Sequence, residues 1–167
     1  MLLIAEKMQH LIFSELMQIY EEGNLENGRE LYPEESECRR LFLAEQDFYN
    51  YLTQVFFPTK GAVYAIWAPD GCYAAALRLE PYRDGLLLSA LETRPSLRRM
   101  GHAEKLIFSI LLYLSKQGNV KIYSHIRKNN AASLGVHRKC GFEIVQDYAV
   151  YTDGSVMYNS YTLCKSV

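Results

Sequence analysis

The sequence has 167 residues, of which 49% are hydrophobic and 22% charged, and its formal net charge is −1. This length suits one substantial hydrophobic core and is short for two, and the composition is that of a globular chain rather than a disordered one. Near-neutral charge without a basic run argues against nucleic-acid binding, and no apolar stretch is long enough to cross a membrane.

The first sixty residues are expected to be mainly helical. Apolar residues recur at helical spacing from Met8 to Tyr20 and again from Leu41 to Val55, which predicts two amphipathic helices. The segment between them, residues 21–37, is polar and contains Gly23, Asn24, Asn27, Gly28 and Pro33. That composition predicts a loop.

Strand signals begin near residue 62. Ala62–Ala68 and Cys72–Leu79 flank Pro69-Asp70-Gly71 and should form a hairpin. A turn over residues 81–85 then leads into an apolar strand, Leu86–Glu92. Three antiparallel strands are therefore expected.

Helix and strand patterns alternate after residue 100. Residues 103–116 have a clear apolar face, and Val120–Ile126 is the next expected strand. Because a helix connects this strand to Leu86–Glu92, the two strands should be parallel. The chain should end in a hairpin in which residues 143–151 and 155–163 flank Thr152-Asp153-Gly154.

The junction between the strand Leu86–Glu92 and the following helix has the features of an anion cradle. It contains Arg98, Gly101 and Ala103, with Pro95 upstream. Backbone N–H groups at a helix start are unpaired and lie at the positive end of the helix dipole, and glycine lets a ligand approach the backbone closely. Residues 61–167 also carry thirteen basic and eight acidic side chains. A ligand with several phosphates would suit this site.

A second motif lies downstream. Asn130 precedes a short helical segment that ends at Gly141-Phe142 before a strand. Asn130 can cap the helix, and Gly141 can adopt the left-handed conformation that ends it.

Arg98-x-x-Gly101-x-Ala103 followed by Asn130 to Phe142 resembles the two cofactor motifs of the GNAT-type N-acetyltransferase superfamily. The resemblance extends over roughly residues 62–163. It implies an α/β (α+β) fold with a mixed central sheet, mostly antiparallel, with one splayed parallel strand pair and flanking helices. We expect a single domain, 1–167, with a helical acceptor-side part at 1–60 and the sheet and cofactor part at 61–167.

The resemblance also implies that acetyl-CoA is the cosubstrate. Its pyrophosphate would bind at the cradle, and its pantetheine arm would bind backbone groups beside the splayed strand pair. The residues expected to contact it are Leu91, Thr93, Arg98, Arg99, Met100, Gly101, His102, Ala103 and Asn130.

Glu92 is the first candidate for the general base, because it ends the central strand beside the expected splay. Many family members carry a carboxylate three residues earlier, where this chain has Ser89. Glu80 and His125 are alternatives for the base.

His137 is the candidate general acid. It occupies the helix position at which the family commonly has a tyrosine that protonates the departing thiolate. The same histidine can instead pack against Phe142. Three tyrosines of the last hairpin are further candidates: Tyr148, Tyr151 and Tyr158.

The expected function is acetyl transfer from acetyl-CoA to a primary amine of a small molecule or peptide by direct attack. The alternatives are a catalytically inactive module that binds CoA or acyl-CoA, and a helix-rich interaction protein. Seven glutamates between the first two helices suggest a cationic acceptor: Glu21, Glu22, Glu26, Glu30, Glu34, Glu35 and Glu37.

The remaining expectations concern metals and location. The four cysteines, Cys38, Cys72, Cys140 and Cys164, are too far apart in sequence for a zinc motif or a disulfide framework. Glu6 interrupts the apolar start of the chain and no basic segment precedes it, so we expect no signal peptide and a cytoplasmic location. The sequence does not predict an oligomeric state.

Overall fold

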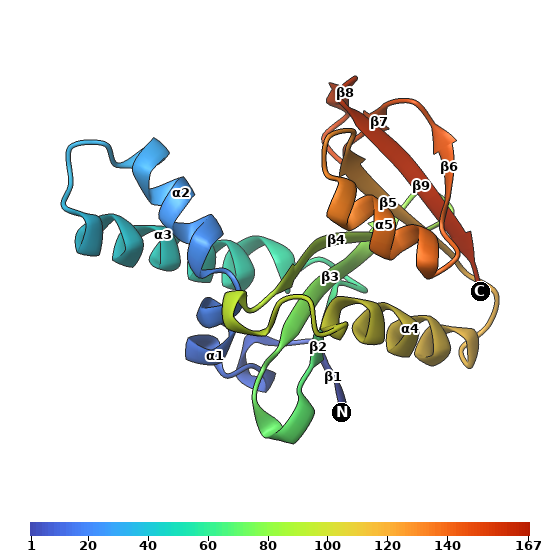
Figure 1. The fold of residues 1–167 in the computed structure, drawn as a ribbon, viewed down its shortest axis with the longest axis horizontal. Helices are drawn as coiled ribbons and strands as arrows, with labels where there is room; N and C mark the ends of the chain where they lie inside the picture. Colours follow the sequence, from blue (N-terminus) through green and yellow to red (C-terminus); the bar gives the residue numbers. More distant parts are fainter.

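A computed structural model describes residues 1–167, and it contains a central seven-stranded mixed sheet (Figure 1). All neighbouring strands are antiparallel except the parallel pair β4 (Gly85–Thr93) and β5 (Lys121–Arg127). This confirms the predicted mixed sheet with one parallel pair. In spatial order the strands are β1 (Leu2–Ala5), β2 (Val63–Trp67), β3 (Ala75–Tyr82), β4 (Gly85–Thr93), β5 (Lys121–Arg127), β9 (Ser160–Ser166) and β6 (Glu143–Gln146).

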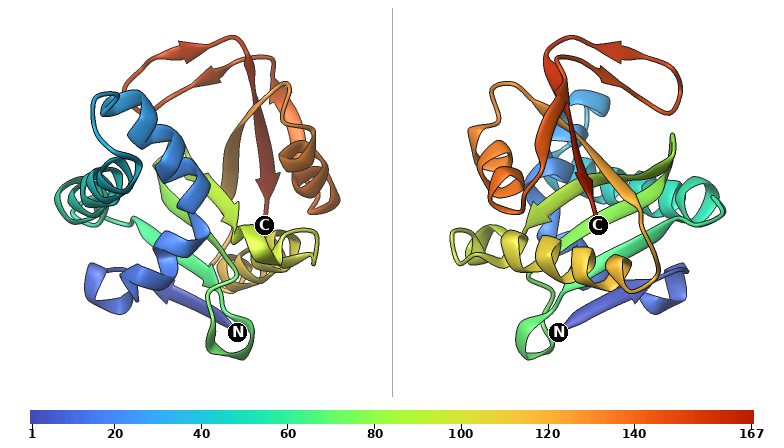
Figure 2. Two further views of the ribbon diagram at one scale, coloured as in Figure 1. Left: turned by 60° about the vertical axis from the view of Figure 1, so that its left-hand side comes forward. Right: turned by 90° about the vertical axis from the view of Figure 1, so that its right-hand side faces the viewer.

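Helices flank this sheet on both sides (Figure 2). On one face, α1 (Phe13–Ile19) and the end of α3 (Glu37–Tyr51) pack against the strands, and α2 (Glu21–Leu31) packs on α3. On the other face lie α4 (His102–Ser115) and α5 (Ala131–Lys139). No helix combines the length and the apolar character needed to cross a membrane. The α-helices are α1 (Phe13–Ile19), α2 (Glu21–Leu31), α3 (Glu37–Tyr51), α4 (His102–Ser115) and α5 (Ala131–Lys139). The shorter helical segments are η1 (Met8–His10), η2 (Leu52–Phe56), η3 (Pro69–Gly71) and η4 (Pro95–Leu97).

The alternation of side chains along the strands produces two cores. Leu77 and Leu79 of β3 belong to the cluster that packs under α4, whereas Ala76 of the same strand belongs to the cluster that packs under α1 and η2. Successive strand residues point to opposite faces, so one strand supplies both cores. The sheet is therefore packed against helices on both faces.

The predicted loop over residues 21–37 is wrong, because residues 21–31 form helix α2. The residues that suggested turns have packing roles instead. A Cβ atom at Gly28 would lie 2.7 Å from the backbone oxygen of Arg40 in α3, so glycine lets the two helices cross closely. Asn24 is buried and its amide contacts the sulfur of Met17 at 3.4 Å.

The N-terminal segment also differs from the prediction. Leu2–Ala5 forms β1 and pairs antiparallel with β2, from Leu2 with Trp67 to Ala5 with Tyr64. The expected helix from Met8 to Tyr20 is divided into η1 and α1. Residues 1–60 therefore contribute an edge strand as well as helices.

The closing hairpin is more complex than predicted. β6 pairs with β9, while β7 (Ala149–Val150) and β8 (Val156–Met157) form a separate small sheet around the predicted turn. The hydroxyl of Tyr82 in β3 donates to the carbonyl oxygen of Val150. This contact ties β7 to β3 of the central sheet.

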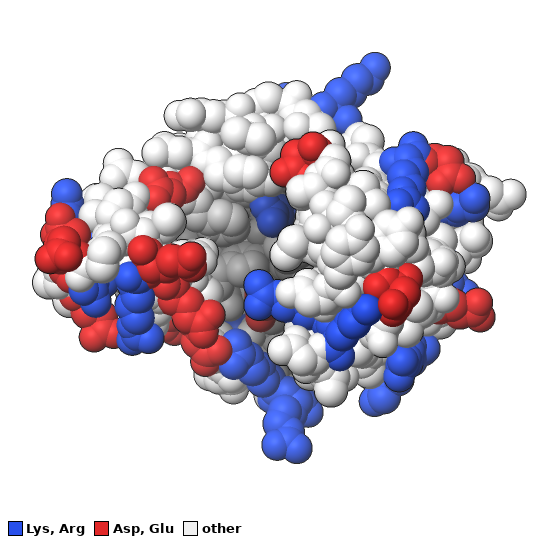
Figure 3. Space-filling view, turned by 90° about the horizontal axis from the view of Figure 1, so that it is seen from above, with Lys and Arg blue, Asp and Glu red and all other residues white.

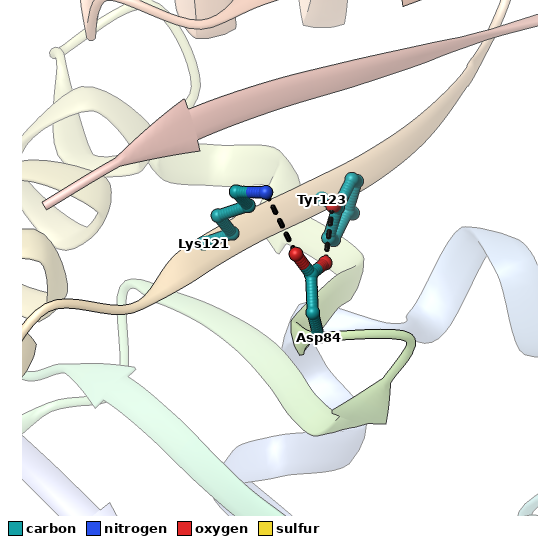
Figure 4. Close-up of polar contacts among 3 residues, drawn as sticks. All are labelled: Asp84, Lys121 and Tyr123. Carbon is teal, nitrogen blue, oxygen red and sulfur yellow. Dashed lines mark hydrogen bonds and ion pairs between the residues drawn. The ribbon is translucent and has the colours of Figure 1, made fainter.

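The turn between β3 and β4 is anchored to β5 (Figure 4). Asp84 accepts hydrogen bonds from Lys121 Nζ at 2.7 Å and from the Tyr123 hydroxyl at 2.6 Å. These two partners, Lys121 first, lower the pKa of the Asp84 carboxyl to about 2. The ionised carboxylate thereby holds the start of the parallel pair in register.

Candidate functional site

The parallel pair opens partway along β4. Its register runs from Gly85 opposite Lys121 to Leu88 opposite Ser124, and no further β4 residue pairs with β5. On its other side, β4 has one more residue than β3 between the pairs Ala76–Glu92 and Arg78–Ser89. This bulge includes Ala90, which has a φ of 49°. The backbone beyond it diverges from β5, as the predicted splay requires.

The start of α4 lies next along the chain from this opening. Gly101 precedes the helix with a φ of 77°, and the first helical hydrogen bond runs from Lys105 N to Gly101 O at 3.0 Å. The N–H groups of residues 102–104 therefore precede the helix's own hydrogen bonding. A Cβ atom at Gly101 would meet no protein atom within 4 Å, so this backbone is open to a ligand.

Helix α5 supplies the opposite wall. The side-chain oxygen of Asn130 accepts a hydrogen bond from Ser133 N at 3.0 Å, which makes Asn130 the cap of the helix, as predicted.

These three elements enclose one cavity of about 470 Å³. The structure brings to it most of the side chains that the sequence suggested. Those predicted residues are Leu91, Glu92, Thr93, Arg98, Arg99, Gly101, His102, Ala103 and Asn130.

Five lining residues were missed: Glu104, Ala132, Ser133, Val136 and Lys139. Four of them belong to α5, and three of these, Ser133, Val136 and Lys139, recur every three residues, which places them on one face of the helix beside Ala132. This spacing after Asn130 was the signal that could have identified them. Lys139 and Glu104 form an ion pair at 3.6 Å across the cavity wall.

Two predicted site residues do not line the cavity. The Met100 side chain is 59% exposed and lies outside it. His137 is only 1% exposed, and its ring packs edge-on against Phe142 with centroids 5.1 Å apart. The Nδ1 atom of His137 lies 2.9 Å from the carbonyl oxygen of Ser133, and Nε2 is buried without a partner. Burial lowers the pKa of this imidazole.

The carboxyl group of Glu92 lies at the cavity with an altered acidity. The residue is exposed, and partial removal of water by the surrounding protein raises its pKa. Arg98 opposes this shift, and the negative charges of Glu22 and Glu26 reinforce it. A carboxylate with a raised pKa is a stronger base than an ordinary glutamate. The electrostatics of Glu92 therefore suit proton transfer.

The alternative catalytic residues lie elsewhere. Neither Glu80 nor His125 lines the cavity. The His125 ring lies between Tyr82 and Tyr151, at centroid distances of 5.3 and 5.0 Å. Burial, aided by the charge of Arg83, lowers the pKa of His125 to about 4. Tyr148 and Tyr158 contact each other and also lie outside the cavity.

The seven glutamates lie on helices and a short turn rather than in one long loop. Figure 3 shows acidic side chains gathered at the end of the molecule formed by α2 and α3, beside a central hollow. Glu22 forms an ion pair with Arg98 at 2.7 Å, and Glu37 pairs with Arg29 at 2.8 Å. Of these seven glutamates, Glu22 and Glu26 raise the pKa of Glu92.

The fold occurs in solved structures of several acetyltransferases. The PaiA N-acetyltransferase of Thermoplasma acidophilum, solved in complex with coenzyme A, has a TM-score of 0.65 and 13% identity, with 100% of this chain and 99% of that chain covered. The ribosomal-protein-S18-alanine N-acetyltransferase of Escherichia coli has a TM-score of 0.59 and 17% identity, with 100% and 94% covered.

An aminoglycoside 6'-acetyltransferase type Ii has a TM-score of 0.63 and 12% identity, with 99% of this chain and 96% of that chain covered. At these identities the likeness shows the fold alone. A comparison with curated proteins finds no match. The sequence itself matches the acetyltransferase (GNAT) family across residues 16–142, most of the chain. This protein therefore belongs to the GNAT acetyltransferase family.

Proposed function

We propose that this protein transfers the acetyl group of acetyl-CoA to a primary amine by direct attack of the amine. The observation that carries the proposal is the cavity lined by the diverging end of β4, the open start of α4 and two arginines, Arg98 and Arg99. A structural neighbour from Thermoplasma acidophilum was solved with coenzyme A.

The residues of the cavity fit the parts of acetyl-CoA. The unpaired N–H groups at the start of α4 and the two guanidinium groups suit the pyrophosphate. Backbone groups of Leu91 and Thr93 suit the amides of the pantetheine arm, because β4 has no partner strand on that side. Asn130 would bind the same arm from α5.

When bound, acetyl-CoA supplies an acetyl group activated as a thioester. Glu92 takes a proton from the protonated amine, directly or through water, so that the nitrogen lone pair can form the new C–N bond. The backbone N–H of Leu91 stabilises the negative charge that develops on the carbonyl oxygen. As the C–S bond breaks, the nitrogen releases its second proton to water and the departing thiolate takes a proton from a general acid. Overall the amide and the CoA thiol form and one proton is released.

His137 is the proposed general acid. Its ring does not line the cavity, so it would deliver the proton through a water molecule rather than by direct contact with the thiolate. Because Nδ1 contacts the Ser133 carbonyl, only Nε2 is left to deliver a proton. Because burial lowers its pKa, the protonated form of His137 is less populated at neutral pH than that of an exposed histidine.

We expect His137→Phe to reduce kcat about tenfold or more while the Kd for CoA changes little, because the ring does not line the cavity. Steady-state kinetics at saturating acetyl-CoA and acceptor, repeated across pH, would measure this. A kcat equal to that of the wild type at every pH would show that His137 only packs against Phe142.

A catalytically inactive module that binds CoA remains the second proposal, because CoA binding alone requires neither Glu92 nor an acceptor. The two are separated by incubating the protein with isotope-labelled acetyl-CoA and a panel of amines. Label in an amine product identifies a transferase, whereas CoA binding without transfer to any amine favours the module.

The acceptor is proposed to be cationic, because Glu92 lines the cavity and lies close enough to Glu22 and Glu26 for their negative charges to raise its pKa. Such carboxylates steer a positive ligand toward the site, and salt screens this attraction over about 8 Å at physiological strength. We expect kcat/KM for a polyamine, an aminoglycoside or a lysine peptide to fall severalfold between low and physiological salt.

An uncharged arylamine is the control in the same measurement, and its kcat/KM should depend little on salt. A preference for the arylamine that is insensitive to salt would contradict a cationic acceptor and would leave the proposed cosubstrate unaffected.

A further inference from the structure

Two buried tyrosines connect helix α1 to the bulge in β4. The Tyr64 hydroxyl donates to the Tyr20 oxygen at 2.9 Å, and the Tyr20 hydroxyl donates to the carbonyl oxygen of Ala90 at 2.7 Å. Tyr64 is 0% exposed and Tyr20 is 9% exposed. A carbonyl oxygen can only accept, so the Tyr20 hydroxyl must donate its one hydrogen to Ala90 and accept a hydrogen bond from Tyr64.

The residue held in this way is the bulge residue itself. Ala90 lies two residues after the last β4 residue that pairs with β5, and its φ of 49° is unfavourable for any side chain larger than hydrogen. A non-glycine residue keeps this conformation only where its surroundings enforce it. The hydrogen bond from Tyr20 is a constraint of this kind.

The constraint also extends to the next peptide group. The chain has no cis peptide bond, so the carbonyl of Ala90 and the N–H of Leu91 point in opposite directions from one rigid plane. Fixing the carbonyl therefore fixes the direction of the Leu91 N–H. Leu91 is the first β4 residue that lines the cavity.

We propose that Tyr20 is a positioning residue for acetyl transfer: by holding the Ala90 carbonyl, it orients the Leu91 N–H toward the thioester carbonyl oxygen. The inference rests on the proposed function, since it needs acetyl-CoA in this cavity. Tyr20 acts through the backbone and from the face of the sheet covered by α1, whereas α4 and α5 lie on the other face.

Two properties suit the pair to this task. Burial raises the pKa of both phenols, so each remains a hydrogen-bond donor at every physiological pH. The Tyr20 ring is held independently of its hydroxyl, edge-on to Phe48 at 5.3 Å and to Tyr64 at 6.5 Å. Phenylalanine at position 20 should therefore keep the packing and lose only the hydrogen bonds.

The test compares Tyr20→Phe with Tyr64→Phe, which also loses a buried hydroxyl but keeps the bond from Tyr20 to Ala90. Calorimetry measures the Kd of each variant for acetyl-CoA and for CoA, which lacks the acetyl group. We expect Tyr20→Phe to bind acetyl-CoA about tenfold more weakly and CoA unchanged, the equivalent of one misplaced hydrogen bond. In Tyr64→Phe both constants should stay within about twofold of the wild type.

A spectroscopic measurement reports on the carbonyl directly. With acetyl-CoA labelled with carbon-13 at the carbonyl, wild type and Tyr64→Phe should shift the bound carbonyl resonance downfield, because an N–H donor polarises the C=O bond. Tyr20→Phe should lose most of this shift. Should Tyr20→Phe fail to fold, the Tyr20→Phe/Tyr64→Phe double variant replaces it, because it leaves no buried hydroxyl without a partner.

An unchanged ratio of the two Kd values together with an unchanged carbonyl shift in folded Tyr20→Phe would overturn the inference. Equal losses in Tyr20→Phe and Tyr64→Phe would also overturn it, because they would indicate a general structural effect. A wild-type protein that binds neither ligand would overturn the proposed function itself, and this separates the two failures.

Discussion

Gly101→Glu should weaken CoA binding on the order of a hundredfold. The new side chain would start from a backbone with a φ of 77° and project into the open space where no protein atom lies within 4 Å. Strain in the left-handed conformation costs about 1 kcal/mol, and a carboxylate beside the pyrophosphate adds electrostatic repulsion. Calorimetry with CoA on the folded variant measures the loss.

Two matched variants separate the causes. Gly154→Glu places the same side chain at a φ of 86° in another open position, in the turn between β7 and β8, and should leave CoA affinity unchanged. Gly101→Ala introduces strain without charge and should lose less than tenfold. Wild-type affinity in Gly101→Glu would remove the start of α4 from the cofactor site.

Most of the residues that line the cavity could be predicted from the sequence because their placement depends on local backbone geometry. Arg98 and Gly101 lie between an apolar strand and an apolar helix, and the unpaired N–H groups at such a helix start suit an anion. Asn130 likewise caps α5 through contacts three residues away. Such local rules need no knowledge of the rest of the fold.

The errors arose where distant contacts override local preference. The glycines and asparagines of residues 21–31 suggest a loop, yet α2 forms because Gly28 fits against Arg40 of a neighbouring helix. The packing of His137 against Phe142 was one of two alternatives at the sequence level, and its contact with the Ser133 carbonyl became visible only in the fold. No glycine lies beside Ala90 in β4, and no other residue there would have predicted the bulge.

The acidity of Glu92 predicts how activity depends on pH. Desolvation raises its pKa, and Glu22 and Glu26 raise it further. Only the ionised form accepts a proton, so kcat/KM should rise with pH through this raised pKa. Glu26→Gln removes one repulsive charge, should lower the pKa of Glu92, and should move this limb to lower pH. Glu26 has no ion pair of its own, so this variant leaves the Glu22–Arg98 contact intact.

Glu92→Gln should reduce kcat about a hundredfold, the usual contribution of a general base, and should abolish the acidic limb of the pH profile. Glutamine keeps the size of the side chain, so the Kd for CoA should remain within about twofold of the wild type. Glu80→Gln is the control, because Glu80 does not line the cavity, and it should keep most of the activity. The measurement is acetyl transfer to the amine identified in the labelled panel, from pH 5 to 9. If Glu92→Gln keeps the wild-type rate and Glu80→Gln loses it, the base is Glu80, and Glu92 serves only as part of the negative wall that attracts the amine.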